Sequence, residues 1–264
     1  MLETITAVQF DKLAGNGRTG PGFITCEDSV GDPIEVVAKL SHRCDLRETS
    51  LAMEVVAACL AGDLGLPVPQ PYLVRMDADW IDTVADTAWA AAARQSSPIA
   101  FGSKRVPPGY NAWIVGTVLM AGMVGTAAGV MTFDAVIDNP DRRESNSNCL
   151  QRGDDLRIID HELCLSPVPL LGWRPPWHLG ALHHMETPGA HIFRAPLRKQ
   201  TIDWDAIRAA WQGLSDTHLA DYQGALPGEW ASAGPAVGKA IDKIRNARDN
   251  IDGCIAEVQR VLTC

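Results

Sequence analysis

Four polar residues near the middle of the chain are of the types that move protons and hold metal ions. Asp141, Asn146 and Asn148 lie in the segment NPDRRESNSNCL (139–150), and Asp160 ends the apolar run LRIID. A phosphoryl transfer that uses Mg²⁺ needs a carboxylate beside the attacking group, and Mg²⁺ prefers carboxylate and amide oxygens as ligands. The pattern therefore predicts either such a site or a turn in which Asx side chains bond to their own backbone.

A glycine-rich run, GNGRTG, contains Gly15, Gly17 and Gly20. The dinucleotide-binding version of this spacing opens a helix directly after a strand, but here the strand-like segment GFITC follows. A glycine loop between two strands is instead typical of a loop that covers nucleotide phosphates. A flexible surface turn is the alternative interpretation.

Two isolated charges, Lys39 and Glu54, stand in apolar surroundings. Lys39 lies in the strand-like segment IEVVAKL, where both faces are apolar, and Glu54 lies within an Ala-, Val- and Leu-rich helical stretch. A buried ammonium is costly unless an anion balances it, so we expect the two side chains to pair. The alternative places the lysine head group and the carboxylate separately in solvent.

Regular elements must position these residues. GFITC and IEVVAKL on either side of the turn DSVGDP predict a hairpin, and Asp45 with Glu48 predicts a capping box before a helix that Gly65 ends. We further expect strands at YLVRM, PIAFGSK and 156–160, and helices at 82–95, within 124–138, at 203–213 and at 236–262.

This order of elements predicts the α+β class with two lobes. Strands dominate the first part of the chain and helices the second. We place the β-rich lobe, with the glycine loop, the lysine strand and the glutamate helix, at residues 1–104, and the helical lobe at residues 105–264.

Composition restricts the class of protein. The chain has 264 residues, a net charge of −9 and seven scattered cysteines without a CxxC motif. The acidic balance disfavours a non-specific nucleic-acid surface, although a local basic patch stays open, and the cysteine pattern favours a reduced, cytoplasmic protein. The N-terminus is not typical of a signal peptide, and the uncharged run 115–133 is rich in glycine and predicts buried helix rather than a membrane span.

The joint pattern resembles the HipA-like kinases. The segments FDAVIDNPDRRESNSNCL and LRIIDHELCL resemble their catalytic core, and are similar to the DR…N…IDFG pattern of phosphatidylinositol kinases. The resemblance extends back through LGLPVPQP, the glutamate helix and VVAKL, and covers about residues 13 to 166. It implies a two-lobed protein-kinase-like fold that binds ATP and Mg²⁺.

The resemblance also implies a role for each candidate residue. Asp141 would be the catalytic base, with Asn146 and Asp160 as metal ligands, and Asn148 is the alternative to Asn146. Asn146 is preferred because it follows Asp141 by five residues, as in the wider kinase pattern. The nucleotide would be held by the glycine loop, by the phosphate-binding lysine with its glutamate partner, and by an adenine-contacting segment: Gly15, Gly17, Gly20, Lys39, Glu54 and Phe101 to Lys104.

Two departures from the family pattern concern the metal segment and the N-terminus. The metal segment reads IDHE rather than Asp-Phe-Gly, which leaves the geometry after Asp160 open. The chain starts almost at the glycine loop, so we expect it to lack the additional N-terminal subdomain of the longer HipA toxins.

Four histidines, His178, His183, His184 and His191, gather in HLGALHHMETPGAH near Trp173 and Trp177. Adjacent histidines can bind zinc, but no cysteine pair or HExxH spacing accompanies them. Packing and surface roles are the leading interpretation, with a metal site or a loop that recognises a substrate or partner as alternatives.

The sequence as a whole predicts an ATP- and Mg²⁺-dependent phosphotransferase that acts on a protein hydroxyl. Two alternatives stay open. One is a nucleotide-binding pseudokinase that serves as an interaction module. The other is a metal-dependent phosphoester hydrolase that would use Asp138, Asp141 and Asp160 as a two-metal cluster.

Overall fold

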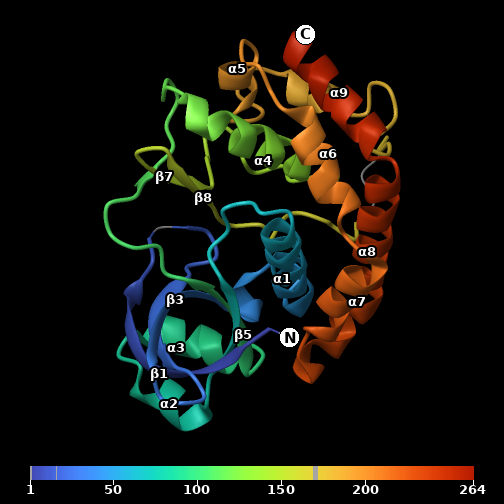
Figure 1. Ribbon diagram of the computed structural model, residues 1–264. Coiled ribbons are helices and arrows are strands. Elements are labelled where there is room, and N and C mark those ends of the chain that lie inside the picture. Colours follow the sequence, from blue (N-terminus) through green and yellow to red (C-terminus); the bar gives the residue numbers. More distant parts are fainter. Residues whose placement is uncertain (1, 16, 169–171) are drawn as a thin grey trace. The chain divides into compact units, whose positions relative to one another are not determined.

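The computed structural model describes residues 2–15, 17–168 and 172–264, which contain both strands and helices (Figure 1). Two compact units can be distinguished. The first consists of the chain up to Cys59, of Pro69–Val106 and of Asp221–Gly238, and the second of Leu60–Val68, Pro107–Ala220 and Lys239–Cys264.

A closed five-stranded barrel forms the centre of the first unit. The strands follow the order β1-β2-β3-β5-β4 around it; β1 and β4 pair in parallel and the other pairs are antiparallel. The expected hairpin is present as β2 and β3, because their apolar residues alternate and a tight turn joins them. The strand bounds are Thr4–Leu13 (β1), Gly22–Glu27 (β2), Pro33–Lys39 (β3), Pro71–Arg75 (β4) and Ile99–Lys104 (β5).

The barrel core is closed by two short helices where one helix, 82–95, was expected. They are α2 (Ala78–Thr83) and α3 (Thr87–Arg94). The helix is interrupted because Asp86 caps α3, its carboxylate accepting a hydrogen bond from the backbone N–H of Trp89. Trp89 is fully buried in the barrel core and its ring lies 4.7 Å from that of Phe10.

Helix α1 (Glu48–Asp63) carries a nearly continuous buried surface. The expected capping box does not form, so that prediction is wrong. Asp45 instead forms an ion pair with Arg18, and the carboxylate of Glu48 accepts a hydrogen bond from Ser41 Oγ at 2.7 Å. Both carboxylates are therefore engaged by other side chains rather than by the first backbone N–H groups of the helix.

A segment from late in the chain completes the first unit. Trp230, in the short 3-10 turn Gly228–Ala233, is fully buried. Its indole N–H lies 3.2 Å from Ser97 Oγ and 3.1 Å from the carbonyl oxygen of Ile99. Hydrogen bonds thus join residues more than a hundred positions apart within the first unit.

The second unit is built around helix α4 (Val124–Val136), which is buried on most of its surface. It packs against α5, α6 and α9 (Figure 1). The second half of the uncharged run 115–133 lies in this buried helix. Within the described part of the chain, no helix combines the length and the apolar character needed to cross a bilayer. The helix bounds are Arg194–Leu197 (α5), Trp204–Gln212 (α6) and Ile251–Thr263 (α9).

The C-terminal helical run differs from the single helix expected at 236–262. It forms α8 (Gly234–Asp249) and α9, separated at Asn250, whose φ of −118° is not helical. The Asn250 N–H is shared between the carbonyl oxygens of Asn246 and Ala247, and its side-chain amide also donates to Asn246. A further short helix, α7 (Asp216–Gly224), precedes α8 and was not expected.

A small three-stranded sheet carries the polar loop of interest. Its order is β6-β7-β8, with β6 at Asn111–Ala112, β7 at Cys149–Arg152 and β8 at Asp155–Ile158. The sequence predicted a strand-turn at 156–160 but not β7. Segment 139–148 runs between α4 and β7, so its two ends are anchored by a buried helix and a paired strand.

Candidate functional site

The glycine run closes the hairpin between β1 and β2. The backbone N–H of Ala14 donates to the carbonyl of Pro21 at 2.8 Å, and that of Gly20 donates to Gly17 at 2.9 Å. The strand–glycine loop–strand arrangement predicted from the sequence is therefore present, and the backbone of the loop folds back on itself.

Two of the three glycines occupy conformations that other residues rarely adopt. Gly15 has a φ of 141° and Gly20 a φ of 52°. At Gly20, a Cβ atom would also lie 2.0 Å from Nη1 of Arg43, which donates a hydrogen bond to the Gly20 carbonyl. A side chain at position 20 would thus displace Arg43 and strain the loop.

Lys39 and Glu54 form a buried ion pair. Nζ of Lys39, the last residue of β3, lies 2.8 Å from Oε2 of Glu54 in α1. Their side chains are only 8% and 3% exposed, so the two solvated alternatives do not apply. The pairing predicted from two isolated charges in apolar segments is present, because each charge balances the cost of burying the other.

The register of the barrel brings three predicted nucleotide-site segments to one end. Gly22, which follows the glycine loop, pairs with Ala38, and the next residue, Lys39, pairs with Phe101 on β5. Phe101 is buried, whereas Lys104 at the end of β5 is exposed. The first unit thus places the glycine loop, the lysine and the strand 99–104 side by side.

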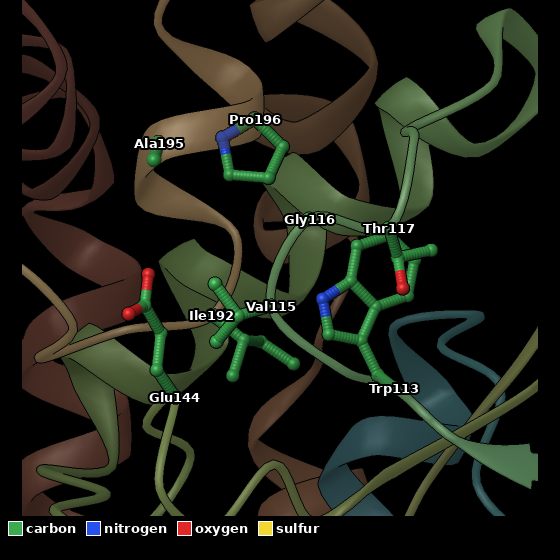
Figure 2. Close-up of a pocket in the computed structure, with 8 residues that line it drawn as sticks. All are labelled: Trp113, Val115, Gly116, Thr117, Glu144, Ile192, Ala195 and Pro196. Carbon is green, nitrogen blue, oxygen red and sulfur yellow. The ribbon is translucent and has the colours of Figure 1, made fainter.

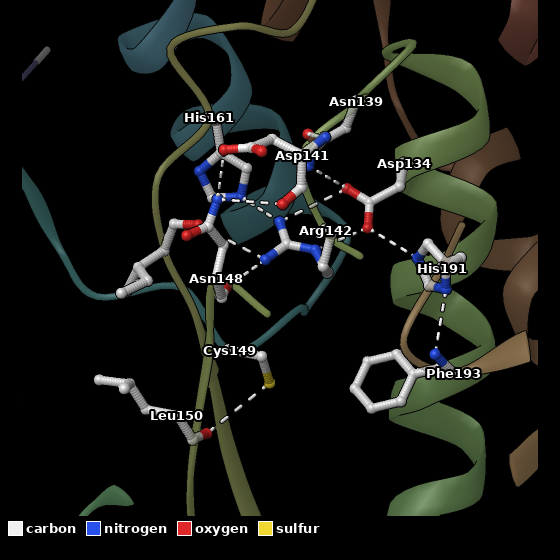
Figure 3. A network of polar contacts seen from close by, with 11 residues as sticks. Asp134, Asn139, Asp141, Arg142, Asn148, Cys149, Leu150, His161, His191 and Phe193 are labelled. Carbon is white, nitrogen blue, oxygen red and sulfur yellow. Dashed lines mark hydrogen bonds and ion pairs between the residues drawn. The ribbon is translucent and has the colours of Figure 1, made fainter. Parts of the chain in front are cut away.

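In the second unit, Asp141 is surrounded by donors from its own loop, of which Figure 3 labels Asn148. Oδ2 accepts from Nδ2 of Asn146 at 2.7 Å and from Nδ2 of Asn148 at 3.1 Å, and Oδ1 accepts from Nη2 of Arg143 at 3.3 Å. A tight backbone pairing of Arg143 with Asn146 folds the loop so that these side chains converge.

The orientation of both amides follows from this arrangement. A carboxylate only accepts, so Asn146 and Asn148 turn their NH₂ groups toward Asp141. Their amide oxygens then point away from the carboxylate. Asn146 is exposed and Asn148 is buried, which makes the oxygen of Asn146 the more accessible of the two candidate ligands.

The buried side chain of Arg142 holds the loop in position. Its guanidinium is fully buried and bonds to Asp134 on α4, with Nε 2.6 Å from Oδ2. It also donates to the carbonyl oxygens of Asn148 and Ile159, and Nη2 lies 2.9 Å from Nε2 of His161. One side chain therefore ties the helix, the loop and the segment before Asp160 together (Figure 3).

Asp134 is the buried anion of this network. It also accepts hydrogen bonds from Nδ2 of Asn139 at 2.8 Å and from Nε2 of His191 at 3.1 Å. Burial alone would raise the pKa of Asp134, but the Arg142 guanidinium and the hydrogen bond from His191 outweigh it and hold the pKa well below its usual range. The carboxylate therefore stays ionised beneath the loop.

The ring nitrogens of both histidines in the network have defined roles as donor or acceptor. Nδ1 of His191 accepts from the backbone N–H of Phe193 at 3.2 Å, so its hydrogen is on Nε2, facing Asp134. Nε2 of His161 faces the guanidinium of Arg142, which can only donate, so its hydrogen is on Nδ1.

Asp160 follows the network directly in the chain. The backbone N–H of Ile159 donates to the carbonyl of Asn148 at 3.0 Å, and Asp160 itself adopts a left-handed φ of 61°. A carboxylate oxygen of Glu162 lies within 4.8 Å of one from Asp160. Carboxylate oxygens are among the ligands that Mg²⁺ prefers, so this pair of neighbouring acids fits such an ion.

The IDHE segment differs in detail from Asp-Phe-Gly. Where the family pattern has phenylalanine, His161 is buried, and its ring meets that of Phe133 edge to face with centroids 5.7 Å apart. The histidine thus keeps an aromatic contact with α4 and adds a hydrogen bond to Arg142.

Asp138 does not join Asp141. Its carboxylate accepts from Nε1 of Trp173 at 2.6 Å and forms an ion pair with Lys243 on α8. These contacts hold the Trp173 side chain against Asp138. They give no support to a metal cluster that includes Asp138.

The histidine-rich segment divides into one buried residue and three others. His191 belongs to the Asp134 network, whereas His178, His183 and His184 join no group of three potential metal ligands among the residues that the structure describes. Packing, the leading interpretation from the sequence, holds for His191.

Cys149 lies at the start of β7 beside the network. Burial raises the pKa of its thiol to about 12, so it carries no thiolate near neutral pH.

The sequence did not identify Asp134, His161 and Glu162 as members of the site. Asp134 sits in an apolar helix as an isolated acid, the same signal that singled out Glu54, and could have been found that way. Glu162 carried no comparable signal, because acids after a strand are common.

Comparison with known proteins relates the chain to one family. Residues 42–257 match the family of HipA-like kinases, a range that includes Glu54, Asp141 and Asp160 and begins after Lys39. No curated protein matches the chain. A Helicobacter pylori proinflammatory kinase, CtkA, is a similar solved structure, with 12% identity and a TM-score of 0.48 over 96% of this chain and 99% of that one.

Proposed function

The chain belongs to the HipA-like kinase family, and on this premise we propose that it is an ATP- and Mg²⁺-dependent phosphotransferase that phosphorylates a protein hydroxyl. We also propose that residues 1–104 and 105–264 are the two lobes of a protein-kinase-like fold, and that the protein acts in the cytoplasm. The observation that carries the proposed activity is the loop that holds the Asp141 carboxylate beside the amides of Asn146 and Asn148.

Nucleotide binding is assigned to the first unit. The glycine loop with Gly15, Gly17 and Gly20 covers the phosphates with its backbone N–H groups, and Lys39 holds a phosphate while Glu54 orients it. Phe101 to Lys104, on the strand paired with that of Lys39, contacts the adenine. The buried ion pair supports this assignment, because it fixes the lysine head group at the same barrel end as the glycine loop.

Metal binding is assigned to Asn146 and Asp160, with Asn148 as the alternative amide. The bound Mg²⁺ would neutralise charge on the phosphates. The orientation of the amides supports this assignment, since their oxygens face away from Asp141.

Asp141 is assigned to the proton transfer. The substrate hydroxyl oxygen bonds to the γ-phosphorus of ATP while the bond from that phosphorus to the β–γ bridging oxygen breaks. ADP leaves with the electron pair of that bond, and the hydroxyl proton passes to Asp141. Arg142 and Asp134 act as positioning residues, because they hold the loop without facing the substrate.

Incubation of the purified chain with γ-labelled ATP and Mg²⁺ tests the proposed activity. Label transferred to protein supports a kinase; nucleotide binding without turnover indicates a pseudokinase; release of free phosphate together with cleavage of a phosphoester indicates a hydrolase. Asp141→Asn should reduce the transfer about 10²–10⁴-fold. Asp154→Asn is a matched control, because Asp154 is an exposed aspartate outside the network.

A further inference from the structure

A small pocket adjoins the polar loop within the second unit (Figure 2). Its volume is about 170 Å³. Sites for small molecules and cofactors usually measure about 300–1,000 Å³, so this pocket accommodates one side chain rather than a nucleotide. Its lining combines apolar groups with one carboxylate: Trp113, Val115, Gly116, Thr117, Glu144, Ile192, Ala195 and Pro196.

The apolar wall of the pocket is fixed in place. Trp113 is buried, its backbone N–H donates to the carbonyl of Cys149 at 2.8 Å, and its ring packs edge to face on Phe193 at 5.1 Å. Figure 2 shows the Trp113 ring on the side of the pocket opposite Glu144, with Val115 and Ile192 between them. The wall therefore exists before any partner binds.

Glu144 is the charged group of the pocket. Its backbone N–H donates to the carbonyl of Gly189 at 3.0 Å, which holds the residue in position. The carboxylate is exposed and, among the described residues, makes no hydrogen bond or ion pair. A carboxylate fixed by its backbone and left unneutralised favours a cation as its partner.

The surface beside the pocket is apolar. Ile114 is 66% exposed, Val115 64% and Val118 77%, all in the segment that follows β6. Such a run of exposed aliphatic side chains is typical of a surface that another protein covers.

We propose that this pocket binds a lysine or arginine side chain of the protein substrate, an inference that rests on the proposed kinase function. The carboxylate of Glu144 pairs with the cationic head, and the indole of Trp113 and the aliphatic wall contact the methylene stem. The net charge of −9 favours the same kind of partner.

The position of the cationic residue in the substrate follows from the loop. Glu144 lies three residues after Asp141, and three residues of chain span at most about 11 Å. An extended substrate advances about 3.3–3.6 Å per residue, so a backbone span of that length corresponds to about three residues, and we expect the lysine or arginine near that spacing from the phosphorylated hydroxyl.

Phosphorylation of degenerate Ser/Thr peptide libraries tests the proposal. In each library one flanking position is fixed as Lys, Arg, norleucine or Glu. The wild-type chain should prefer Lys or Arg over norleucine by up to about fivefold at one position within three residues of the hydroxyl, as an ion pair to an exposed carboxylate, worth up to about 1 kcal/mol, allows. Glu144→Arg should reverse the preference toward Glu there. Ala195→Phe, which fills the pocket, should abolish it.

Glu229→Arg is the matched control, since Glu229 is an exposed acid in the first unit and makes the same change of charge. Three outcomes would overturn the pocket proposal: a preference for Lys or Arg that survives Glu144→Arg, a preference for norleucine in the wild type, or an equal loss of preference in the control. Because peptides are phosphorylated in each of these cases, the kinase proposal would still stand.

Calorimetric titration with the peptide Ala-Ala-Lys-Ala-Ala amide covers the case in which no peptide is phosphorylated. Binding that Glu144→Gln abolishes, and that the norleucine peptide lacks, supports the pocket although the kinase proposal has failed. Absence of binding together with absence of phosphorylation overturns both.

Discussion

Asn146 donates its side-chain amide to Asp141, with Nδ2 2.7 Å from Oδ2. This contact couples the two tasks assigned to the loop. The hydrogen bond orients the carboxylate that would accept a proton, and it simultaneously turns the amide oxygen, the proposed metal ligand, away from that carboxylate. A change at either residue therefore alters the position of the other.

Asp141→Asn should reduce phosphoryl transfer about 10²–10⁴-fold, the usual contribution of a general base, and leave Mg-ATP affinity within about threefold. The amide keeps the shape of the side chain but cannot take the hydroxyl proton. Single-turnover rates and calorimetric titration with Mg-ATP measure the two quantities. If the folded variant transfers phosphate at the wild-type rate, the loop is only a turn.

Asp160→Asn should weaken both Mg²⁺-dependent ATP binding and turnover, because the change removes a charged metal ligand. Asn146→Ala should show a milder form of the same defect, partly reversed by raising the Mg²⁺ concentration. Titrations of rate against Mg²⁺ at saturating ATP measure this. Asn148→Ala serves as comparison: if it needs more Mg²⁺ than Asn146→Ala does, Asn148 is the amide ligand instead.

Lys39→Met and Glu54→Gln should be non-additive in activity, with a coupling energy of about 0.5–3 kcal/mol, because the two side chains form one buried pair. Each single change removes one charge from that pair and should cost about 3–5 kcal/mol of unfolding free energy. The double variant should regain part of the stability and none of the activity. Urea unfolding and Mg-ATP turnover provide the two readouts. If the two losses of activity are additive and Glu54→Gln turns over Mg-ATP at nearly the wild-type rate, the ion pair has no role in catalysis.

Asp134→Asn should lower the unfolding free energy by about 3–5 kcal/mol near neutral pH, since Arg142 loses the carboxylate that balances it. The pKa of Asp134 is depressed in the folded state relative to about 3.9 in the unfolded chain. Its contribution is therefore fully present above about pH 5 and is lost as the pH falls below about 4.

Urea unfolding of the wild type and of Asp134→Asn between pH 8 and the acid limit of folding measures this prediction. The difference between the two proteins should be constant from pH 8 to 5 and shrink below pH 4. Asp154→Asn, an exposed acid, should show no such change. A wild-type advantage that grows in acid would contradict the assigned direction of the pKa.

The sequence predicted those parts of the site that depend on local pattern. The β2–β3 hairpin follows from alternating strands around a tight turn, and the Lys39–Glu54 pair follows from two charges in segments too apolar to solvate them. Asp141, Asn146 and Asn148 lie close in the chain, so their convergence required only a short loop. The catalytic and metal roles of these residues stay predictions.

Contacts between distant residues could not be predicted from the sequence. His191 reaches Asp134 across 57 positions, and nothing in HLGALHHMETPGAH distinguishes it from its neighbours. The separation of α8 from α9 depends on how Asn250 bonds to the preceding turn, although its flanks are helix-forming on both sides. The capping box is absent because Arg18 pairs with the carboxylate of Asp45 and Ser41 donates to that of Glu48.

The buried position of Trp230 has a consequence for biosynthesis. The barrel strands lie before residue 105, yet the indole that bonds Ser97 and Ile99 is translated much later. At about 5–20 residues per second, a ribosome needs roughly 7–26 s to add residues 107–238. Throughout that interval the nascent barrel lacks the buried indole that donates to Ser97 Oγ and to the Ile99 carbonyl. The first unit therefore matures only after most of the second has been synthesised, and until then the nascent species is the five-stranded barrel without segment 221–238.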